Sequence, residues 1–274
     1  MNYRHLYHAG NFADVAKHLA LVAVLLHLRK KEGPFAVIDT HAGRGEYDLR
    51  APEAQRTDEA ANGIGRLAGV EAKMPVLQTY LDLVREGSSY PGSPLIAAKL
   101  LRPQDRLIAV EKHNDDGAAL ISALQPFHKA HAEIADGYLR LPALLPPPER
   151  RGVVLIDPPY EAADEFATAA HGFAAAYRRF ATGIYLVWFP IKSPAQAGSF
   201  CGELLAAGAK KALRLDMAIG ETSPDRLTAA GLFVANPPYG FAGEMDAALA
   251  QIMPLLGNRV GPAKARVDWL IGKE

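Results

Sequence analysis

The sequence predicts an α/β protein with a Rossmann-like, doubly wound sheet, and three observations carry this prediction. Short apolar runs alternate with longer segments of helical periodicity, as in a mostly parallel sheet flanked by helices. The run Val153–Ile156 has four branched apolar residues in succession, typical of a strand buried on both faces. An acidic residue follows each of the first four predicted strands, at the edge where open α/β sheets bind ligands.

Composition limits the possible organisations and classes. The chain has 274 residues, of which 49% are apolar and 22% charged, enough for one large α/β domain or one domain with an insertion. A single cysteine, Cys201, excludes an intramolecular disulfide and a multi-cysteine zinc site, so no metal is expected and a reducing cytoplasm fits. The formal net charge is zero, so a nucleic-acid substrate would have to meet a local basic patch.

The amino-terminal region predicts a largely buried helix over residues 12–31, preceded by a basic and aromatic segment. The apolar run Leu19–Leu26 is too short to span a bilayer, and no signal-peptide pattern accompanies it. Cations that suit phosphates and aromatics that suit unpaired bases gather here, favouring an RNA contact: Tyr3, Arg4, His5, Tyr7, His8, Lys17 and His18. A solvated terminal segment explains the same cluster equally well.

The first predicted strand, Phe35–Ile38, leads into an acid and a glycine-containing loop, Asp39–Gly45. Glycines at this place let the backbone approach a ligand closely. The loop resembles that of enzymes that bind S-adenosylmethionine, with His41 where a small or aromatic residue is more usual. No lysine and hydroxyl follow in P-loop spacing, which disfavours a nucleoside triphosphate.

Residues 47–90 form a connection several times longer than an ordinary βα loop. We interpret it as an inserted, mostly helical subdomain, so that residues 1–46 and 91–274 together make the Rossmann-like domain. After it, Ser93 is a predicted N-cap, with Pro94 at the first position of a helix Leu95–Leu101.

The second and third strands supply two more acids at the ligand edge. Arg106–Val110 ends at Glu111, where such folds bind the ribose hydroxyls of a nucleoside cofactor. After a helix Ala118–His128, the strand Ala132–Ala135 ends at Asp136 and Gly137, placed to accept from the adenine amino group of the cofactor. Beyond the fourth strand, further elements are expected over residues 163–180, 184–189, 194–207, 212–218, 232–236, 243–256 and 265–271.

The fourth strand ends at Asp157-Pro158-Pro159-Tyr160, a rim suited to a planar amine. The two prolines stop the strand and stiffen the turn. The Asp157 carboxylate and the Pro158 carbonyl are acceptors for the two hydrogens of an amino group, and Tyr160 offers a flat face for stacking. This tetrapeptide resembles the signature of methyltransferases that act on amino groups of adenine, cytosine or glutamine.

A second stretch, Asn236-Pro237-Pro238-Tyr239, repeats the pattern near the other end of the chain. In a doubly wound methyltransferase the catalytic rim follows the fourth strand, whereas Asn236 follows the seventh. We therefore assign Asp157 to catalysis and interpret Asn236 as a structural turn.

The order of these features predicts a class I methyltransferase that uses S-adenosylmethionine. Together with the terminal Tyr-Arg-His, Lys17-His18 and Tyr90–Pro94, they resemble the bacterial RlmJ family of 23S ribosomal RNA adenine-N6 methyltransferases. The resemblance covers essentially the whole chain and implies a monomer that methylates one adenine on protein-free ribosomal RNA. It implies cofactor binding at His18, His41, Ser93, Glu111, Asp136, Gly137 and Asp157. It also places the proton acceptor at Asp157 and an RNA-contacting tyrosine at Tyr3, while Tyr239 stands where the family also has tryptophan.

Three alternatives stay open at this level. A DNA adenine-N6 methyltransferase shares the rim, but no target-recognition domain is visible. A glutamine methyltransferase of this fold prefers Asn at the first rim position, which here is Asp157. A non-catalytic module that binds S-adenosylmethionine and RNA is disfavoured by the intact rim. Whether Asp157 takes the proton directly or through water is not determined by the sequence.

Overall fold

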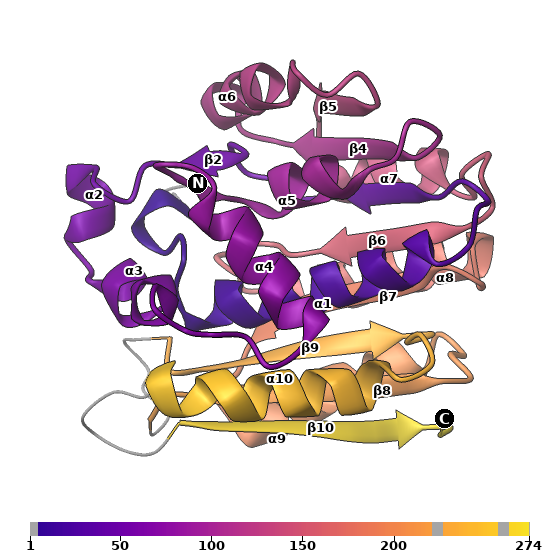
Figure 1. Ribbon diagram of the computed structural model, residues 1–274. Helices are drawn as coiled ribbons and strands as arrows, with labels where there is room; N and C mark the ends of the chain where they lie inside the picture. Colours follow the sequence, from indigo (N-terminus) through magenta and orange to yellow (C-terminus); the bar gives the residue numbers. More distant parts are fainter. Residues whose placement is uncertain (1–4, 221–226, 257–262, 274) are drawn as a thin grey trace.

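The computed structural model describes residues 5–220, 227–256 and 263–273, which form one central sheet covered by helices on both faces (Figure 1). The main sheet contains β1 Ala36–Asp39, β4 Arg106–Glu111, β5 Ala130–Ile134, β6 Gly152–Ile156, β7 Ile184–Pro190, β8 Ala212–Ala218, β9 Ala229–Ala235 and β10 Lys264–Ile271. Their order is β10-β8-β9-β7-β6-β1-β4-β5. This confirms the predicted α/β class, with strand boundaries within three residues of those expected.

The five strands β5, β4, β1, β6 and β7 run parallel. The chain adds β4 and β5 on one side of β1 and then β6 and β7 on the other side, so the order of strands reverses between the neighbours β1 and β6. Such a reversal leaves a crevice at the carboxyl ends of the strands. The three remaining strands alternate in direction, because β9 is antiparallel to β7, β8 to β9 and β10 to β8.

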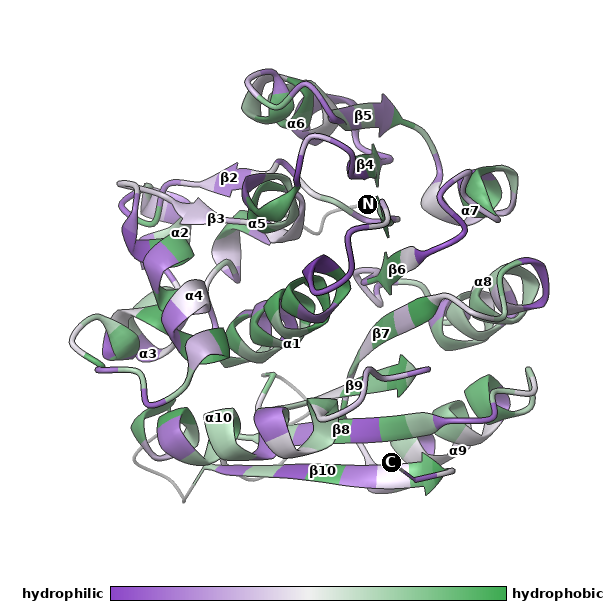
Figure 2. Ribbon diagram, turned by 45° about the vertical axis from the view of Figure 1, so that its right-hand side comes forward, coloured by the Kyte–Doolittle hydropathy of each residue, from purple (hydrophilic) through white to green (hydrophobic). Residues whose placement is uncertain are grey.

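Two groups of helices cover the sheet. On one face of the sheet, a hydrophobic core lies beneath α1 Phe12–Arg29, α5 Ser93–Leu100, α6 Asn114–Leu124 and α10 Phe241–Leu256. On the other face, a second core lies beneath α7 Gly137–Leu144, α8 Glu165–Arg179 and α9 Pro194–Leu205. Helix α1 is hydrophobic through its middle turns, with polar residues near its start and in its last turn (Figure 2). Among the described residues, no helix is both long and apolar enough to cross a membrane.

Two helix starts differ from the sequence predictions. The N-cap of α5 is Gly92, and Ser93 makes no capping hydrogen bond because its hydroxyl binds elsewhere. Helix α6 begins at Asn114, four residues before the predicted start at Ala118. Asp115 and Asp116 in its first turn interact favourably with the positive end of the helix dipole, which explains the earlier start.

The segment between β1 and α5 is bracketed by a short antiparallel pair, β2 Glu46–Tyr47 and β3 Tyr90–Pro91. Between these strands lie α2 Pro52–Gln55, α3 Glu59–Asn62, a 3₁₀ helix Ile64–Leu67 and α4 Pro75–Arg85. Helix α4 packs against α1 and α10, and its buried face joins the core on that side of the sheet. The segment is therefore mostly helical, and it returns to its starting point through the pairing of Tyr47 with Tyr90.

The interpretation of Asn236 as a structural turn is confirmed. Because β9 is antiparallel to β7, Ala235 pairs with Tyr185 near the start of β7, at the edge opposite Asp157. The Asn236 side-chain amide donates to the carbonyls of Ala181 at 2.8 Å and Gly183 at 2.7 Å. Asn236 thus ties two turns together, away from the ligand edge.

Candidate active site

A cavity of about 300 Å³ opens at the carboxyl ends of the parallel strands, beside the start of α1. It is large enough to be a small-molecule site. Its walls include most of the residues that the sequence assigned to chemistry or ligand binding, but not Asp39 or Tyr7: His5, His8, Lys17, His18, His41, Ser93, Glu111, Asp136, Gly137, Asp157, Pro158 and Tyr160. Tyr3 and Arg4, which also belong to the predicted RNA-contacting cluster, lie outside the described residues.

Asp157 follows β6 directly and is 14% exposed at the cavity wall. Its Oδ2 atom accepts a hydrogen bond from the Lys17 ammonium. Within the described residues no donor bonds its other oxygen, Oδ1, or the carbonyl of Pro158. The rim therefore keeps two acceptors available toward the cavity.

The ring of Tyr160 is held in a fixed orientation beside these acceptors. Its backbone adopts a left-handed conformation with φ of 52°, which a non-glycine residue keeps only where neighbouring contacts hold it. The Tyr160 hydroxyl donates to the carbonyl of Trp188 at 2.7 Å, and its ring packs 4.6 Å from that of Phe166. Burial raises the Tyr160 pKa well above its ordinary value, so the phenol stays protonated.

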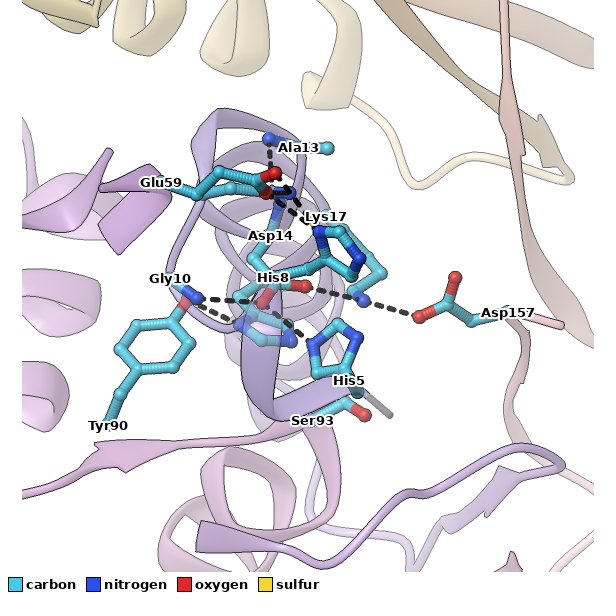
Figure 3. A network of polar contacts seen from close by, with 12 residues as sticks. His5, His8, Gly10, Ala13, Asp14, Lys17, Glu59, Tyr90, Ser93 and Asp157 are labelled. Carbon is cyan, nitrogen blue, oxygen red and sulfur yellow. Dashed lines mark hydrogen bonds and ion pairs between the residues drawn. The ribbon is translucent and has the colours of Figure 1, made fainter. Parts of the chain in front are cut away.

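Lys17 lies at the centre of a buried ionic network that joins α1 to the rim (Figure 3). Its ammonium contacts Asp14 Oδ1 at 2.8 Å as well as Asp157, and Asp14 Oδ2 accepts from His5 and from the Gly10 backbone, each at 2.9 Å. Burial acts to lower the Lys17 pKa, but the two carboxylates outweigh it and raise the pKa well above its ordinary value. Lys17 is therefore a permanent cation.

This placement corrects one sequence prediction. Lys17 was expected in an exposed basic cluster that contacts RNA phosphates, but only 5% of its side chain is exposed and its charge is already paired twice. An ammonium in this position acts on the Asp157 carboxylate, not on the molecular surface.

The glycine loop after β1 is held from two sides. Gly43 has φ of 62°, and a Cβ atom there would lie 2.3 Å from the Tyr47 hydroxyl, so only glycine fits. The Gly43 N–H donates to Glu111 Oε2 at 2.8 Å, and Glu111 Oε1 accepts from the His113 N–H at 2.7 Å. The carboxylate of Glu111 is thus oriented at the end of β4, with lone pairs left for a ligand.

Asp39 is nearly inaccessible at the end of β1, where its Oδ2 accepts from the Ser93 hydroxyl at 2.6 Å. Burial raises its pKa to about 7, against the opposing effect of the hydrogen bond from Ser93. Ser93 therefore stabilises the loop from the start of α5 by binding Asp39, which explains why it is not free to cap the helix.

Asp136 caps α7 and closes the far side of the cavity. Its Oδ1 accepts from the backbone of Tyr138 at 3.0 Å and Leu139 at 3.2 Å, and its Oδ2 accepts from Lys112 at 2.8 Å. A Cβ atom on Gly137 would lie 2.0 Å from the Thr40 carbonyl, so glycine allows α7 to approach the loop after β1.

Two histidines in the wall are neutral. Burial lowers the pKa of His18 to about 3 and that of His41 to about 4. The Nδ1 atom of His18 is 2.7 Å from the Tyr90 hydroxyl, and that of His41 is 2.8 Å from the Thr40 hydroxyl. Each ring therefore presents its Nε2 side to other partners, without a charge.

Several wall residues were missed by the sequence analysis. Asp14 precedes Lys17 by three residues on a predicted helix, a spacing that places an acid and a base together and was the available signal. Tyr47, Tyr138 and Glu165 also line the cavity, and only the packing of distant segments reveals them.

A doubly wound sheet with a glycine loop after β1 and an Asp-Pro-Pro-Tyr rim after β6, both on one cavity, defines a class I S-adenosylmethionine-dependent methyltransferase. Residues 32–271 match the family model described as "Ribosomal RNA large subunit methyltransferase D, RlmJ". The chain belongs to this family.

Individual relatives agree with this membership. The chain is 39% identical to ribosomal RNA large subunit methyltransferase J of Escherichia coli K12, over 99% of both chains. It is 36% identical to the Haemophilus influenzae protein of the same name, over 98% of this chain and 99% of that one. Among solved structures, protein LPL1258 of Legionella pneumophila superposes with a TM-score of 0.87 at 33% identity, covering 95% of this chain and 98% of that chain. A probable spermidine synthase of Corynebacterium glutamicum shares the fold alone, with a TM-score of 0.51 at 12% identity over 96% and 77% of the two chains.

Proposed function

We propose that this chain transfers a methyl group from S-adenosylmethionine to the exocyclic N6 of one adenine in 23S ribosomal RNA, and that it acts on RNA free of ribosomal proteins. The observation that carries the proposal is the Asp157 rim, where two available acceptors lie beside the fixed ring of Tyr160. Two relatives of nearly equal length bear the name ribosomal RNA large subunit methyltransferase J, which supports an RNA substrate.

The acceptors of the Asp157 rim can increase the nucleophilicity of an aromatic amino group. The N6 amino group of adenine is a poor nucleophile because its lone pair is delocalised into the ring. Asp157 Oδ1 and the Pro158 carbonyl accept its two hydrogens and direct the lone pair along one line. Lys17 occupies Oδ2, so that Oδ1 is the oxygen that accepts from the amine, and the released proton goes to Asp157 or to a water.

The remaining residues of the cavity bind and orient the cofactor and the target adenine. When bound, S-adenosylmethionine supplies an electrophilic methyl group on a sulfonium. Glu111 would accept from the ribose hydroxyls, and the loop from Asp39 to Gly45 would hold the cofactor beside it. His18, His41, Ser93, Asp136 and Gly137 complete its walls. The target adenine leaves its stack and rests on Tyr160, so most of the rate enhancement comes from positioning and electrostatics.

The segment of residues 47–90 supports the amino-terminal side of the cavity. Glu59 accepts from the Asn11 side chain at 2.9 Å and pairs with His8 at 3.0 Å, while Thr57 donates to the Tyr7 carbonyl at 2.6 Å. We assign this segment the role of a helical insert that presents residues 5–11 to RNA. The protein acts as a monomer in the cytoplasm under this proposal.

The test is transfer of labelled methyl from S-adenosylmethionine to protein-free 23S ribosomal RNA, followed by mass-spectrometric mapping of the modified nucleotide. A single N6-methyladenosine is expected. Assembled large subunits and adenine-containing DNA duplexes serve as competing substrates. Preferential methylation of DNA, or no transfer to any nucleic acid, would contradict the proposal.

The cofactor site gives a further prediction. Glu111→Ala should weaken binding of S-adenosylhomocysteine by about 1.5–3 kcal/mol, the scale of a hydrogen bond to a charged group. Isothermal titration calorimetry measures the change directly. Glu133→Ala is the matched control, because Glu133 pairs with Arg140 and does not line the cavity. Equal affinities for wild type and Glu111→Ala would remove Glu111 from the ribose site.

The amino-terminal segment gives another prediction. Arg4→Ala should weaken RNA binding and lower the slope of log affinity against log salt by about one unit or less, since a phosphate contact contributes roughly 0.7–0.9. Tyr3→Ala should reduce methylation with an unchanged slope, because a stacking aromatic releases no counterions. Binding and turnover across a salt series separate the two roles. Wild-type behaviour of both variants would move the RNA surface to residues 47–90.

A further inference from the structure

The carboxylates of the cavity wall are unevenly placed along the sheet. Glu111, Asp116 and Asp136 belong to or follow β4 and β5, on one side of β1. Their negative charges attract the ammonium and hydroxyl groups of a cofactor and repel the phosphates of RNA. An RNA strand that brings an adenine to Asp157 is therefore expected to cross the cavity mouth on the other side, toward β7.

Three lysines line the cavity within the described residues, and two of them are already paired. Lys17 contacts two carboxylates, and Lys112 donates to Asp136 at 2.8 Å. Lys192 is exposed, and no ion pair joins it to a carboxylate of the described residues. Its ammonium therefore keeps its three donors for an anion, without a prior contact to break.

The backbone of Lys192 is held by the elements on either side of it. Strand β7 is parallel to β6 and ends directly before Ile191, whose N–H donates to the Ala229 carbonyl at 2.9 Å. Directly after Lys192, the Ser193 side chain caps the start of α9. Lys192 thus lies between a fixed strand end and a fixed helix start.

The same wall holds the ring on which the target adenine is proposed to rest. The Tyr160 hydroxyl donates to the carbonyl of Trp188, and the two rings lie 5.8 Å apart. Lys192 follows Trp188 by four residues, a reach of at most about 14 Å. In adenosine the N6 amine and the sugar lie at opposite ends, so an adenine with N6 at Asp157 directs its phosphates outward, to the mouth that Lys192 lines.

We propose that the Lys192 ammonium binds a phosphate of the RNA strand next to the target adenosine. This inference rests on the proposed function and deepens it, because it assigns a phosphate contact that the buried and paired Lys17 does not make. Such a contact fixes the path of the strand across the mouth and reads no base.

The first measurement is the affinity of Lys192→Ala, across a salt series, for an RNA segment that contains the target adenosine. The variant should bind roughly three- to tenfold more weakly at low salt, between the effects of an exposed ion pair and of a charged hydrogen bond. The slope of log affinity against log salt should fall by about 0.7–0.9. Lys192→Arg should keep most of the affinity, and binding of S-adenosylhomocysteine should not change in either variant.

Lys211→Ala is the matched control. Lys211 is also exposed and has no ion pair with a described carboxylate, but it lies beside Asn236 at the opposite edge of the sheet. The change removes the same charge from the protein, so it separates a local contact from an effect of net charge. Its affinity for RNA and its salt slope should equal those of wild type.

A second measurement locates the phosphate. Neutral methylphosphonate linkages replace the phosphates on either side of the target adenosine, one at a time. At the contacted linkage the replacement should weaken binding to wild type by about the same factor as Lys192→Ala, and it should add little to the loss in that variant. Such coupling at one linkage supports the inference.

Three results would overturn the role of Lys192: unchanged affinity and slope in Lys192→Ala, an equal loss in Lys211→Ala, or additive effects at every linkage. With any of them, binding and methylation of RNA by wild type leave the proposed function standing. A wild-type protein that neither binds nor methylates RNA would overturn the proposed function, and this inference with it.

Discussion

Asp157→Ala should lower the rate of methyl transfer by about 10²–10⁴-fold, the usual contribution of a positioned acid–base group. The variant loses one of the two acceptors that hold the target amine and the group nearest to its proton. Cofactor affinity should fall far less than the rate, because Glu111 and the glycine loop, which bind the rest of the cofactor, are untouched. Single-turnover rates with saturating RNA and S-adenosylmethionine measure the effect on the chemical step.

The matched control is Asn236→Ala, which alters the second Pro-Pro turn at the opposite edge of the sheet. Its side chain binds the carbonyls of Ala181 and Gly183, so the change should lower the free energy of unfolding and leave the rate per folded molecule unchanged. Turnover of Asp157→Ala within tenfold of wild type, or a comparable loss of rate in Asn236→Ala, would contradict the assignment of the rim.

Lys17→Met should be the most destabilising single change near the site, lowering the free energy of unfolding by about 3–5 kcal/mol. Removing the ammonium leaves the Asp14 and Asp157 carboxylates buried without their common counter-ion. Chemical denaturation at pH 8 measures the loss. Lys99→Met is the control, because its partner Glu86 is 67% exposed and such a pair contributes little.

The stability of Lys17→Met should also depend on pH with a defined sign. In the wild-type protein burial acts to raise the Asp14 pKa, but the charges of His5 and Lys17 hold it well below its ordinary value. Asp14 therefore contributes stability at neutral pH that is lost as the pH falls through its folded-state pKa. Without Lys17 the burial effect gains weight, the folded-state pKa rises, and the deficit of the variant should shrink as the pH falls from 8 toward 4.

A double variant separates charge from shape. Lys17→Met combined with Asp14→Asn removes two opposite charges, so it should be more stable than Lys17→Met alone, and a double-mutant cycle gives the coupling. The double variant should still transfer methyl groups slowly, because Asp157 has lost the cation that holds Oδ2. If Lys17→Met were as stable as wild type at pH 8, the ionic network of Asp14, Lys17 and Asp157 would not stabilise the folded protein.

The local pattern of the chain determined most of the architecture. The apolar runs placed the strands from Ala36 to Ile271, and the acids at the strand ends marked the edge of the sheet where the cavity opens. These predictions succeed because strand periodicity and strand-ending prolines are properties of a few consecutive residues. The number of strands that precede each tetrapeptide also distinguished Asp157 from Asn236, although the two tetrapeptides look alike. The topology of the sheet decides which edge of the sheet each tetrapeptide reaches.

Only the tertiary structure determined which polar residues from distant segments of the chain bind one another. Ser93 reads as a helix cap in its own sequence, yet its hydroxyl binds Asp39, 54 residues away. Lys17 reads as a surface cation, yet it is buried between α1 and the rim and binds Asp157 across 140 residues. The affinity of a hydroxyl or an ammonium for a carboxylate is visible in the sequence, but which carboxylate lies within 3 Å follows from how the sheet and helices pack.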